Sequence, residues 1–144
     1  MSVLHVAFKV GDAEYVLPAS AVLHLESFSG ATKVPGTADS VAGLVHTRGQ
    51  VVPVVDMRAR FGLPPLVRSL DTRVIIVQVG TRTAGLLVDS AREVLDLESE
   101  SFRDPPELIE EQSMGLIKAV AQTAERMVML INLPKILGEK SHAK

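Results

Sequence analysis

Apolar residues along this chain fall into short runs, and most runs end at a polar or glycine-containing turn. Residues 4–10 (LHVAFKV) alternate well enough to predict a half-buried strand. Residues 51–55 (VVPVV) and 73–79 (RVIIVQV) are rich in β-branched side chains and have the length of a strand. The pattern therefore predicts a mainly β fold built from many short strands.

The remaining apolar runs extend this prediction to nearly the whole chain. Further strands are expected at residues 15–17, 22–26, 44–45, 84–88, 94–98, 116–121 and 127–131. Residues 29–40, which are mostly small, and residues 63–71, which contain Pro64 and Pro65, are expected to be connectors. Residues 103–112 combine two prolines with acidic side chains and are expected to form a loop.

The most informative stretch is 43–64, which places a tight turn and a short helix on either side of one strand. Asp56 is a good helix N-cap, and residues 57–61 fit one or two helical turns. The polar turn at 47–50 lifts Arg48 off an otherwise apolar sheet. An isolated guanidinium at such a tip is either a solvated side chain or an anchor for a partner.

The two halves of the chain repeat one another. Residues 22–26 (VLHLE) and residues 94–98 (VLDLE) differ only at the middle position. In each half a strand is followed by a helix cap, Asp56 or Asn132, with a glycine six residues later. Each half holds about five short strands, and five strands can close into a small barrel that leaves no free edge.

The repeat predicts the domain organisation. At 144 residues the chain has the length of one ordinary domain. We expect that domain to span residues 1–138, with a short tail at 139–144. Within it we expect two similar β-barrel subdomains, at about residues 1–65 and 70–138, between which strands can be exchanged.

Composition limits the classes of function that are compatible with the chain. The net charge of −2 and the small aromatic set, four Phe and one Tyr, argue against nucleic acid, which calls for a basic surface and stacking rings. The absence of cysteine excludes disulfides, zinc thiolate sites and thiol nucleophiles. No signal peptide opens the chain, and no apolar run reaches the roughly 18 residues that insertion into a membrane needs. A cytoplasmic protein is expected.

The sequence lacks the signatures of enzymatic chemistry. It contains no phosphate-binding loop or dinucleotide motif, and its histidines have no metal-ligand spacing. His46 lies two residues before Arg48 and could share its surface, and His24 could meet His46 in space. Asp89 and Ser90 are more simply a strand-end turn than a catalytic pair. The sequence predicts binding rather than catalysis, with no cofactor and no metal.

Several motifs together resemble one family. They occur at residues 8–11 (FKVG), 14–15 (EY), 34–35 (VP), 41–43 (VAG), 48–58 (RGQVVPVVDMR), 61–62 (FG), 72–77 (TRVIIV), 85–89 (GLLVD), 93–94 (EV) and 105–106 (PP). With these motifs the chain resembles the CheW family, the adaptors of bacterial chemosensory arrays, over about residues 6–137. The resemblance implies a fold of two SH3-like five-stranded β-barrels with short helices, and no enzymatic activity.

The resemblance also implies partners and contact residues. Family members couple chemoreceptor cytoplasmic tips to the regulatory domain of a CheA-type histidine kinase, in the cytoplasm at receptor arrays. By motif position, Val22, Arg48 and Val51 would form the receptor contact in the groove between the barrels. His24 and His46 would lie beside that surface. Arg48 suits this role because a guanidinium can fork onto carboxylate or carbonyl oxygens.

Some positions depart from the family pattern. His24 replaces a glutamate, Leu116 replaces an aromatic residue, Ala119 replaces a glycine, and residues 124–125 replace a Gly-Asp turn. The later changes bear on the kinase-facing surface, where Leu116 and Ala119 are the candidate positions. One alternative is therefore a paralogue that binds the receptor but not the kinase. A more distant alternative is a small β-barrel that binds a ligand or nucleic acid.

Overall fold

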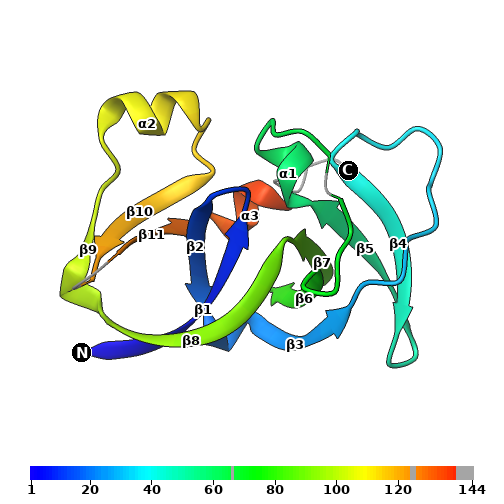
Figure 1. The fold of residues 1–144 in the computed structure, drawn as a ribbon, viewed down its shortest axis with the longest axis horizontal. Coiled ribbons are helices and arrows are strands. Elements are labelled where there is room, and N and C mark those ends of the chain that lie inside the picture. Colours follow the sequence, from blue (N-terminus) through cyan, green and yellow to red (C-terminus); the bar gives the residue numbers. More distant parts are fainter. Residues whose placement is uncertain (66, 124–125, 139–144) are drawn as a thin grey trace.

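The structure, a computed structural model, describes residues 1–65, 67–123 and 126–138 and consists mainly of two β sheets (Figure 1). The six-stranded sheet has the order β8-β1-β2-β11-β10-β9, from β1 (Ser2–Val10), β2 (Ala13–Pro18), β8 (Ser90–Glu98), β9 (Phe102–Arg103), β10 (Ile117–Gln122) and β11 (Met127–Ile131). The five-stranded sheet has the order β3-β6-β7-β5-β4, from β3 (Val22–Ser27), β4 (Val41–Thr47), β5 (Gln50–Asp56), β6 (Arg73–Val79) and β7 (Arg82–Val88). This mainly β fold with two sheet-based units confirms the predicted fold class.

Each sheet takes strands from both halves of the chain. In the six-stranded sheet, β2 pairs in parallel with β11, where Tyr15 lies opposite Met129. In the five-stranded sheet, β5 pairs in parallel with β7, where Val54 lies opposite Gly85. The boundary between the sheets is therefore not the connector at 63–71. The strands of the expected units at about 1–65 and 70–138 are exchanged, because these two parallel pairings join one half to the other.

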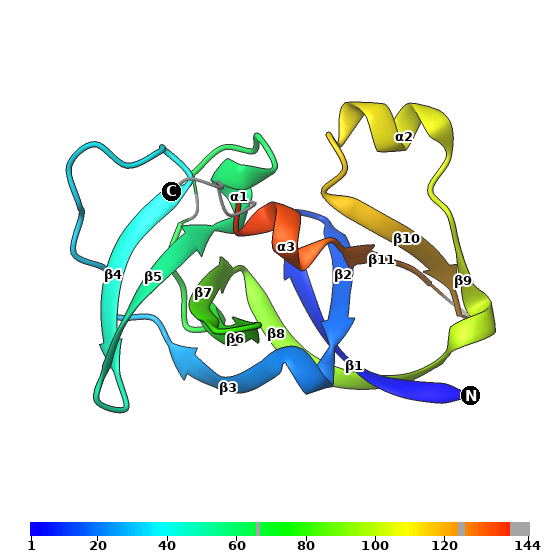
Figure 2. The ribbon, with the colours of Figure 1, turned by 180° about the vertical axis from the view of Figure 1, so that it is seen from behind.

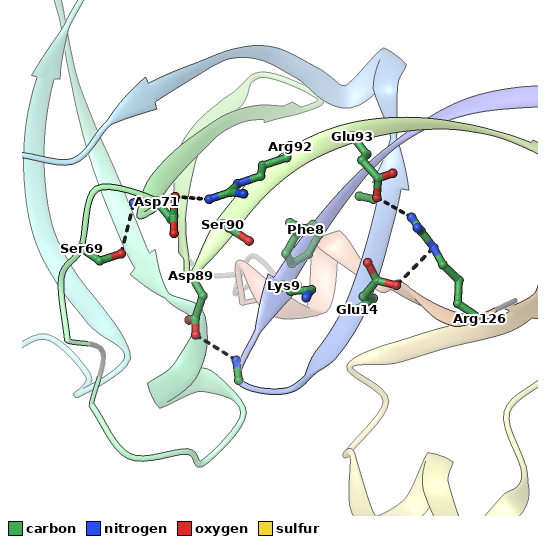
Figure 3. Close-up of a pocket in the computed structure, with 12 residues that line it drawn as sticks. Phe8, Lys9, Glu14, Ser69, Asp71, Asp89, Ser90, Arg92, Glu93 and Arg126 are labelled. Carbon is green, nitrogen blue, oxygen red and sulfur yellow. Dashed lines mark hydrogen bonds and ion pairs between the residues drawn. The ribbon is translucent and has the colours of Figure 1, made fainter.

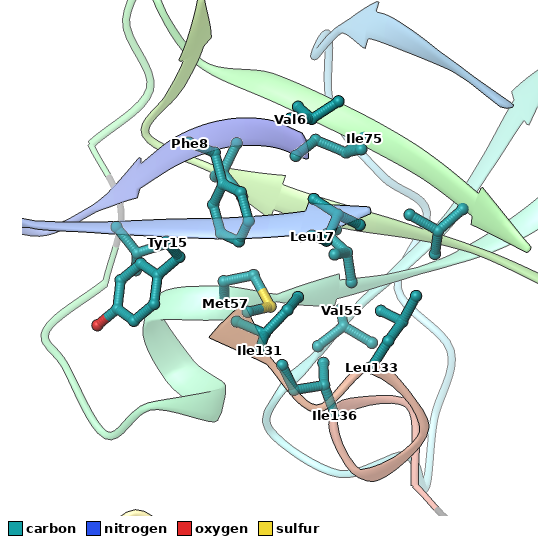
Figure 4. Packing of buried hydrophobic residues seen from close by; sticks show 14 of the residues in the cluster. Val6, Phe8, Tyr15, Leu17, Val55, Met57, Ile75, Ile131, Leu133 and Ile136 are labelled. Carbon is teal, nitrogen blue, oxygen red and sulfur yellow. The ribbon is translucent and has the colours of Figure 1, made fainter. Parts of the chain in front are cut away.

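The two sheets pack on one shared core. Phe8, Tyr15 and Leu17 of the six-stranded sheet meet Ile75 and Leu86 of the five-stranded sheet in this cluster (Figure 4). A smaller cluster lies on the other face of each sheet, made by Ala7, Val16, Leu97, Ala121 and Val128 in one and by Val52, Val54, Val74, Ile76 and Leu87 in the other. Strands such as β6 are thus buried on both faces, which explains their unbroken apolar sequences.

Two of the short helices begin where the sequence predicts. Helix α1 (Met57–Arg60) is capped by Asp56, which accepts hydrogen bonds from the backbone N–H groups of Arg58 and Ala59 at 3.0 and 3.3 Å. Helix α3 (Leu133–Ile136) is capped by Asn132, which accepts from the N–H of Lys135 at 3.3 Å. Both predicted caps are confirmed, and they satisfy backbone donors that a helix leaves free at its start.

The prediction of a loop over residues 103–112 is wrong in its second part, because Glu107–Gln112 form helix α2. Glutamate, leucine and glutamine favour helices, and acidic side chains in the first turn suit the positive end of the helix dipole. All six residues of α2 are exposed, so no apolar periodicity marked the helix. Two short 3₁₀ turns, η1 (Ala19–Ala21) and η2 (Ser99–Ser101), complete the described elements.

Candidate partner-binding site

The turn between β4 and β5 presents Arg48 in a strained conformation. Thr47 pairs with Gln50, so Arg48 and Gly49 alone form the turn. Both have positive φ, 50° and 79°, as a type I′ hairpin turn requires. A non-glycine residue in this region costs on the order of 1 kcal/mol, and such strain concentrates at functional sites. Asparagine or glycine would suit the turn better, so the position favours a role for the arginine side chain.

A cluster of polar side chains links this turn to β3. Glu26 Oε2 accepts a hydrogen bond from the Thr47 hydroxyl at 2.7 Å and lies 2.9 Å from His24 Nε2 and 3.7 Å from Arg48 Nε. Strands β3 and β4 are the two edges of the five-stranded sheet. The cluster therefore joins the edges and closes the sheet into a barrel-like shape, with β3 running toward the hairpin tip (Figure 2).

The guanidinium of Arg48 remains available to a partner. Its side chain is 70% exposed, and 3.7 Å is too long for a hydrogen bond to Glu26. Val51, near the start of β5, is 63% exposed and lies opposite His46, which is also exposed. An exposed cation and an exposed apolar side chain thus lie close to the same tip.

Strand β3 adds apolar surface that the sequence analysis did not assign to the site. Val22 is half-buried and packs on the shared core, whereas Leu23 and Leu25 are exposed. The signal was present, because leucines alternate with half-buried residues along an edge strand. On the six-stranded sheet, Leu4 and Val94 are exposed as well. Exposed apolar side chains on neighbouring positions are typical of a surface that meets a partner.

The two histidines lie on different faces of the hairpin region. His24 belongs to the Glu26 cluster, whereas His46 is exposed on the face of β4 opposite to Thr47. Within residues 1–65, 67–123 and 126–138, no group of three or more His, Cys, Asp or Glu side chains is arranged to hold a metal ion. His24 acts in this structure as a partner of a carboxylate.

The candidate kinase-facing residues lie below the surface. Leu116 and Ala119 are both buried. Leu116 lines a cleft of about 450 Å³ that is mostly apolar and lies between the ends of α1 and α2. Tyr15 and Phe61 line the same cleft. The departures from the family pattern at these two positions therefore change packing beneath the surface, and exposed neighbours would make any direct contact.

A polar cavity of about 630 Å³ lies beside the β1–β2 turn (Figure 3). Arg126 bridges Glu14 and Glu93 at 3.2 and 2.6 Å, and Arg92 pairs with Asp71. Each of these three carboxylates has an arginine partner, so the cavity has the character of a structural network.

Asp89, which the sequence predicts at a strand-end turn with Ser90, is engaged in a structural ion pair. Its two oxygens accept from Arg58 Nε at 3.0 Å and Nη2 at 2.7 Å, and Oδ2 also accepts from the backbone N–H of Gly11 at 3.2 Å. The hydrogen bonds of Asp89 raise the pKa of Arg58 further above its usual value. A carboxylate held in this way is not placed to activate the Ser90 hydroxyl.

These features define a class: a two-sheet β domain with an exposed cation at a hairpin tip and exposed apolar side chains along an edge strand. No helix among the described residues is long and apolar enough to cross a membrane. The family model of the CheW-like domain matches residues 5–141, and the chain belongs to this family.

Individual relatives match most of the chain and most of their own length. The chemotaxis protein CheW of Klebsiella aerogenes is 28% identical over 136 residues, covering 94% of this chain and 82% of the relative. The corresponding protein of Bacillus subtilis is 27% identical, covering 94% and 87%. A crystal structure of the scaffolding protein TtCheW from Thermoanaerobacter tengcongensis superposes with a TM-score of 0.88 at 28% identity, covering 100% of this chain and 97% of that one.

Proposed function

We propose that this protein is a non-enzymatic adaptor of a bacterial chemosensory array, which couples chemoreceptor cytoplasmic tips to a CheA-type histidine kinase. It acts in the cytoplasm, where the receptor tips recruit it. The observation that carries the proposal is Arg48, an exposed guanidinium on a strained turn beside an apolar edge strand. Membership of the CheW-like domain family, whose relatives are chemotaxis proteins, supports it.

The receptor contact is formed by Val22, Arg48 and Val51, with His24 and His46 beside it. Val22 opens β3 directly after η1, which connects the six-stranded sheet to the five-stranded one. It therefore lies at the seam between the sheets, where it packs on the core that they share. A helical receptor tip would cover the exposed leucines of β3 while Arg48 binds its polar oxygens. The area buried and a guanidinium fork together supply affinity and orientation.

Kinase binding belongs to the same proposal. Leu116 and Ala119, where the sequence departs from the family pattern, are buried, so their substitution leaves the exposed surface above them in place. This favours an adaptor that keeps the kinase contact over a paralogue that binds the receptor alone. Binding of the isolated kinase regulatory domain decides between the two.

The test measures binding of the purified protein to a receptor cytoplasmic fragment and, separately, to the kinase regulatory domain, by calorimetry or co-sedimentation. Arg48→Ala is expected to weaken receptor binding tenfold or more, about 1.4 kcal/mol, and to leave folding intact. Val22→Glu should weaken it too, because a carboxylate would face apolar surface. Arg103→Ala, which removes an exposed arginine from β9, is the matched control. Equal receptor affinity of wild type and Arg48→Ala would refute the assigned contact.

A further inference from the structure

Glu26 is a negatively charged side chain that lies beside Arg48 in the proposed receptor contact. Its carboxylate oxygen Oε2 accepts a hydrogen bond from the Thr47 hydroxyl at 2.7 Å. The same oxygen lies 2.9 Å from His24 Nε2 and 3.7 Å from Arg48 Nε. Only a third of the Glu26 side chain is exposed. Two of the three contacts therefore hold the carboxylate in place independently of Arg48.

This arrangement fixes the electrostatic character of the hairpin tip. Arg48 carries one positive charge, and Glu26 places one negative charge beside it, so the pair is close to neutral. An incoming carboxylate would gain the attraction of Arg48 but would also meet the repulsion of Glu26, whose Oε2 lies 3.7 Å from Arg48 Nε. An uncharged oxygen would feel no such repulsion and would still accept hydrogen bonds from the guanidinium donors that Glu26 leaves free.

Glu26 cannot easily turn away to admit a carboxylate. If it did, the Thr47 hydroxyl and the His24 ring would lose their acceptor in a half-buried place, and lost hydrogen bonds of this kind are unfavourable. The contact between β3 and β4 that closes the sheet would be lost as well. The carboxylate is thus a fixed part of the surface that any partner meets.

We propose that Glu26 determines the specificity of the Arg48 contact, so that the partner group bound there is an uncharged oxygen, a backbone carbonyl or a side-chain amide, rather than a carboxylate. The inference rests on the proposed receptor contact and specifies its chemistry. An arginine can bind either carboxylate or carbonyl oxygens, and the charge of this surface selects carbonyl oxygens.

The experiment measures binding of the receptor cytoplasmic fragment to wild type, Glu26→Gln, Arg48→Ala and the control Asp39→Asn, at low and high salt. It is run at about pH 8, where histidine is normally neutral. Glutamine keeps the shape of Glu26 and an acceptor for Thr47 but removes the charge. Asp39 is exposed in the connector after β3, so its substitution changes the net charge equally, away from the hairpin tip.

We expect Glu26→Gln to bind no more tightly than wild type, with the same salt dependence. Wild type and Arg48→Ala should also lose affinity with salt along the same slope, a comparison that does not depend on how Glu26→Gln folds. Binding of Glu26→Gln at least threefold tighter than wild type, with a steeper loss in salt, would show a carboxylate at Arg48 and overturn the inference. If Arg48→Ala binds like wild type, the proposed contact itself fails, so the two failures are distinguishable.

Discussion

Asp89→Asn should destabilise the protein by about 2–3 kcal/mol, because it leaves the guanidinium of Arg58 without its counter-charge. The two side chains are 22% and 23% exposed, and they join through two hydrogen bonds of 2.7 and 3.0 Å. Breaking a fully buried pair costs about 3–5 kcal/mol, whereas an exposed pair contributes at most about 1 kcal/mol. The partial exposure and the hydrogen bonds that asparagine can retain place the expected value between that of an exposed pair and that of a fully buried pair.

Urea unfolding followed by far-ultraviolet circular dichroism is the suitable assay, because the chain has no Trp and one Tyr. For a domain of this size the loss corresponds to a fall in Tm of roughly 5–10 °C. A double-mutant cycle with Arg58→Gln should give a coupling energy of about 2 kcal/mol. Asp96→Asn, an exposed site on β8, is the control. An unfolding free energy of Asp89→Asn within about 0.5 kcal/mol of wild type would refute the reasoning.

Two further predictions concern the interior. Gly85→Ala should lower the free energy of unfolding by about 1–3 kcal/mol through overpacking. Gly85 lies between β5 and β6, and the added Cβ would lie 2.6 Å from Cγ1 of Val74. Unfolding in urea at the wild-type midpoint would contradict this. Burial raises the pKa of Tyr15 above its ordinary value of 10.0. Because the folded state favours the neutral phenol, stability should hold below about pH 10 and fall as the pH rises through the raised pKa. Ultraviolet absorbance follows this single tyrosine, and ionisation at the ordinary pKa in the folded protein would disprove its burial.

Local features of the fold could be predicted from the sequence because their causes lie within a few residues. Asp56 and Asn132 cap helices through their own side chains, and the turn at Arg48 follows from the polar residues that interrupt two apolar runs. Helix α2 was not predicted, because its six exposed residues carry no periodic apolar face. Its helix-forming composition was the available signal, and the two prolines before it favoured a loop instead.

The exchange of strands between the sheets could not be derived from the sequence alone. It depends on the parallel pairings of β2 with β11 and of β5 with β7, which join residues far apart in the chain. Apolar runs such as residues 74–77 would look the same in either sheet, because the strand is buried on both faces. The internal repeat indicated two similar units but contained no information on which strands belong to each.

The sequence likewise indicated some features of the candidate site and not others. The exposed turn position of Arg48 was predicted because a charged residue in a tight turn is visible in sequence. Glu26 was missed, since its partners on the hairpin lie 21 and 22 positions later and meet it only when the edges of the sheet close. One clue was available: Glu26 follows His24 by two residues, so both side chains lie on the same face of β3.

The two crossovers between the sheets connect the stability of the fold with the proposed receptor contact. The chain passes from the six-stranded to the five-stranded sheet at η1, directly before Val22, and returns at Asp89, between β7 and β8. At the second crossover Asp89 binds Arg58 of α1 and the backbone of Gly11 in the β1–β2 turn, so one carboxylate ties both sheets together. The shared core fills the space between the two crossovers. A partner that binds across the seam at Val22 therefore meets two sheets whose relative position is already fixed, and little ordering is left to oppose binding.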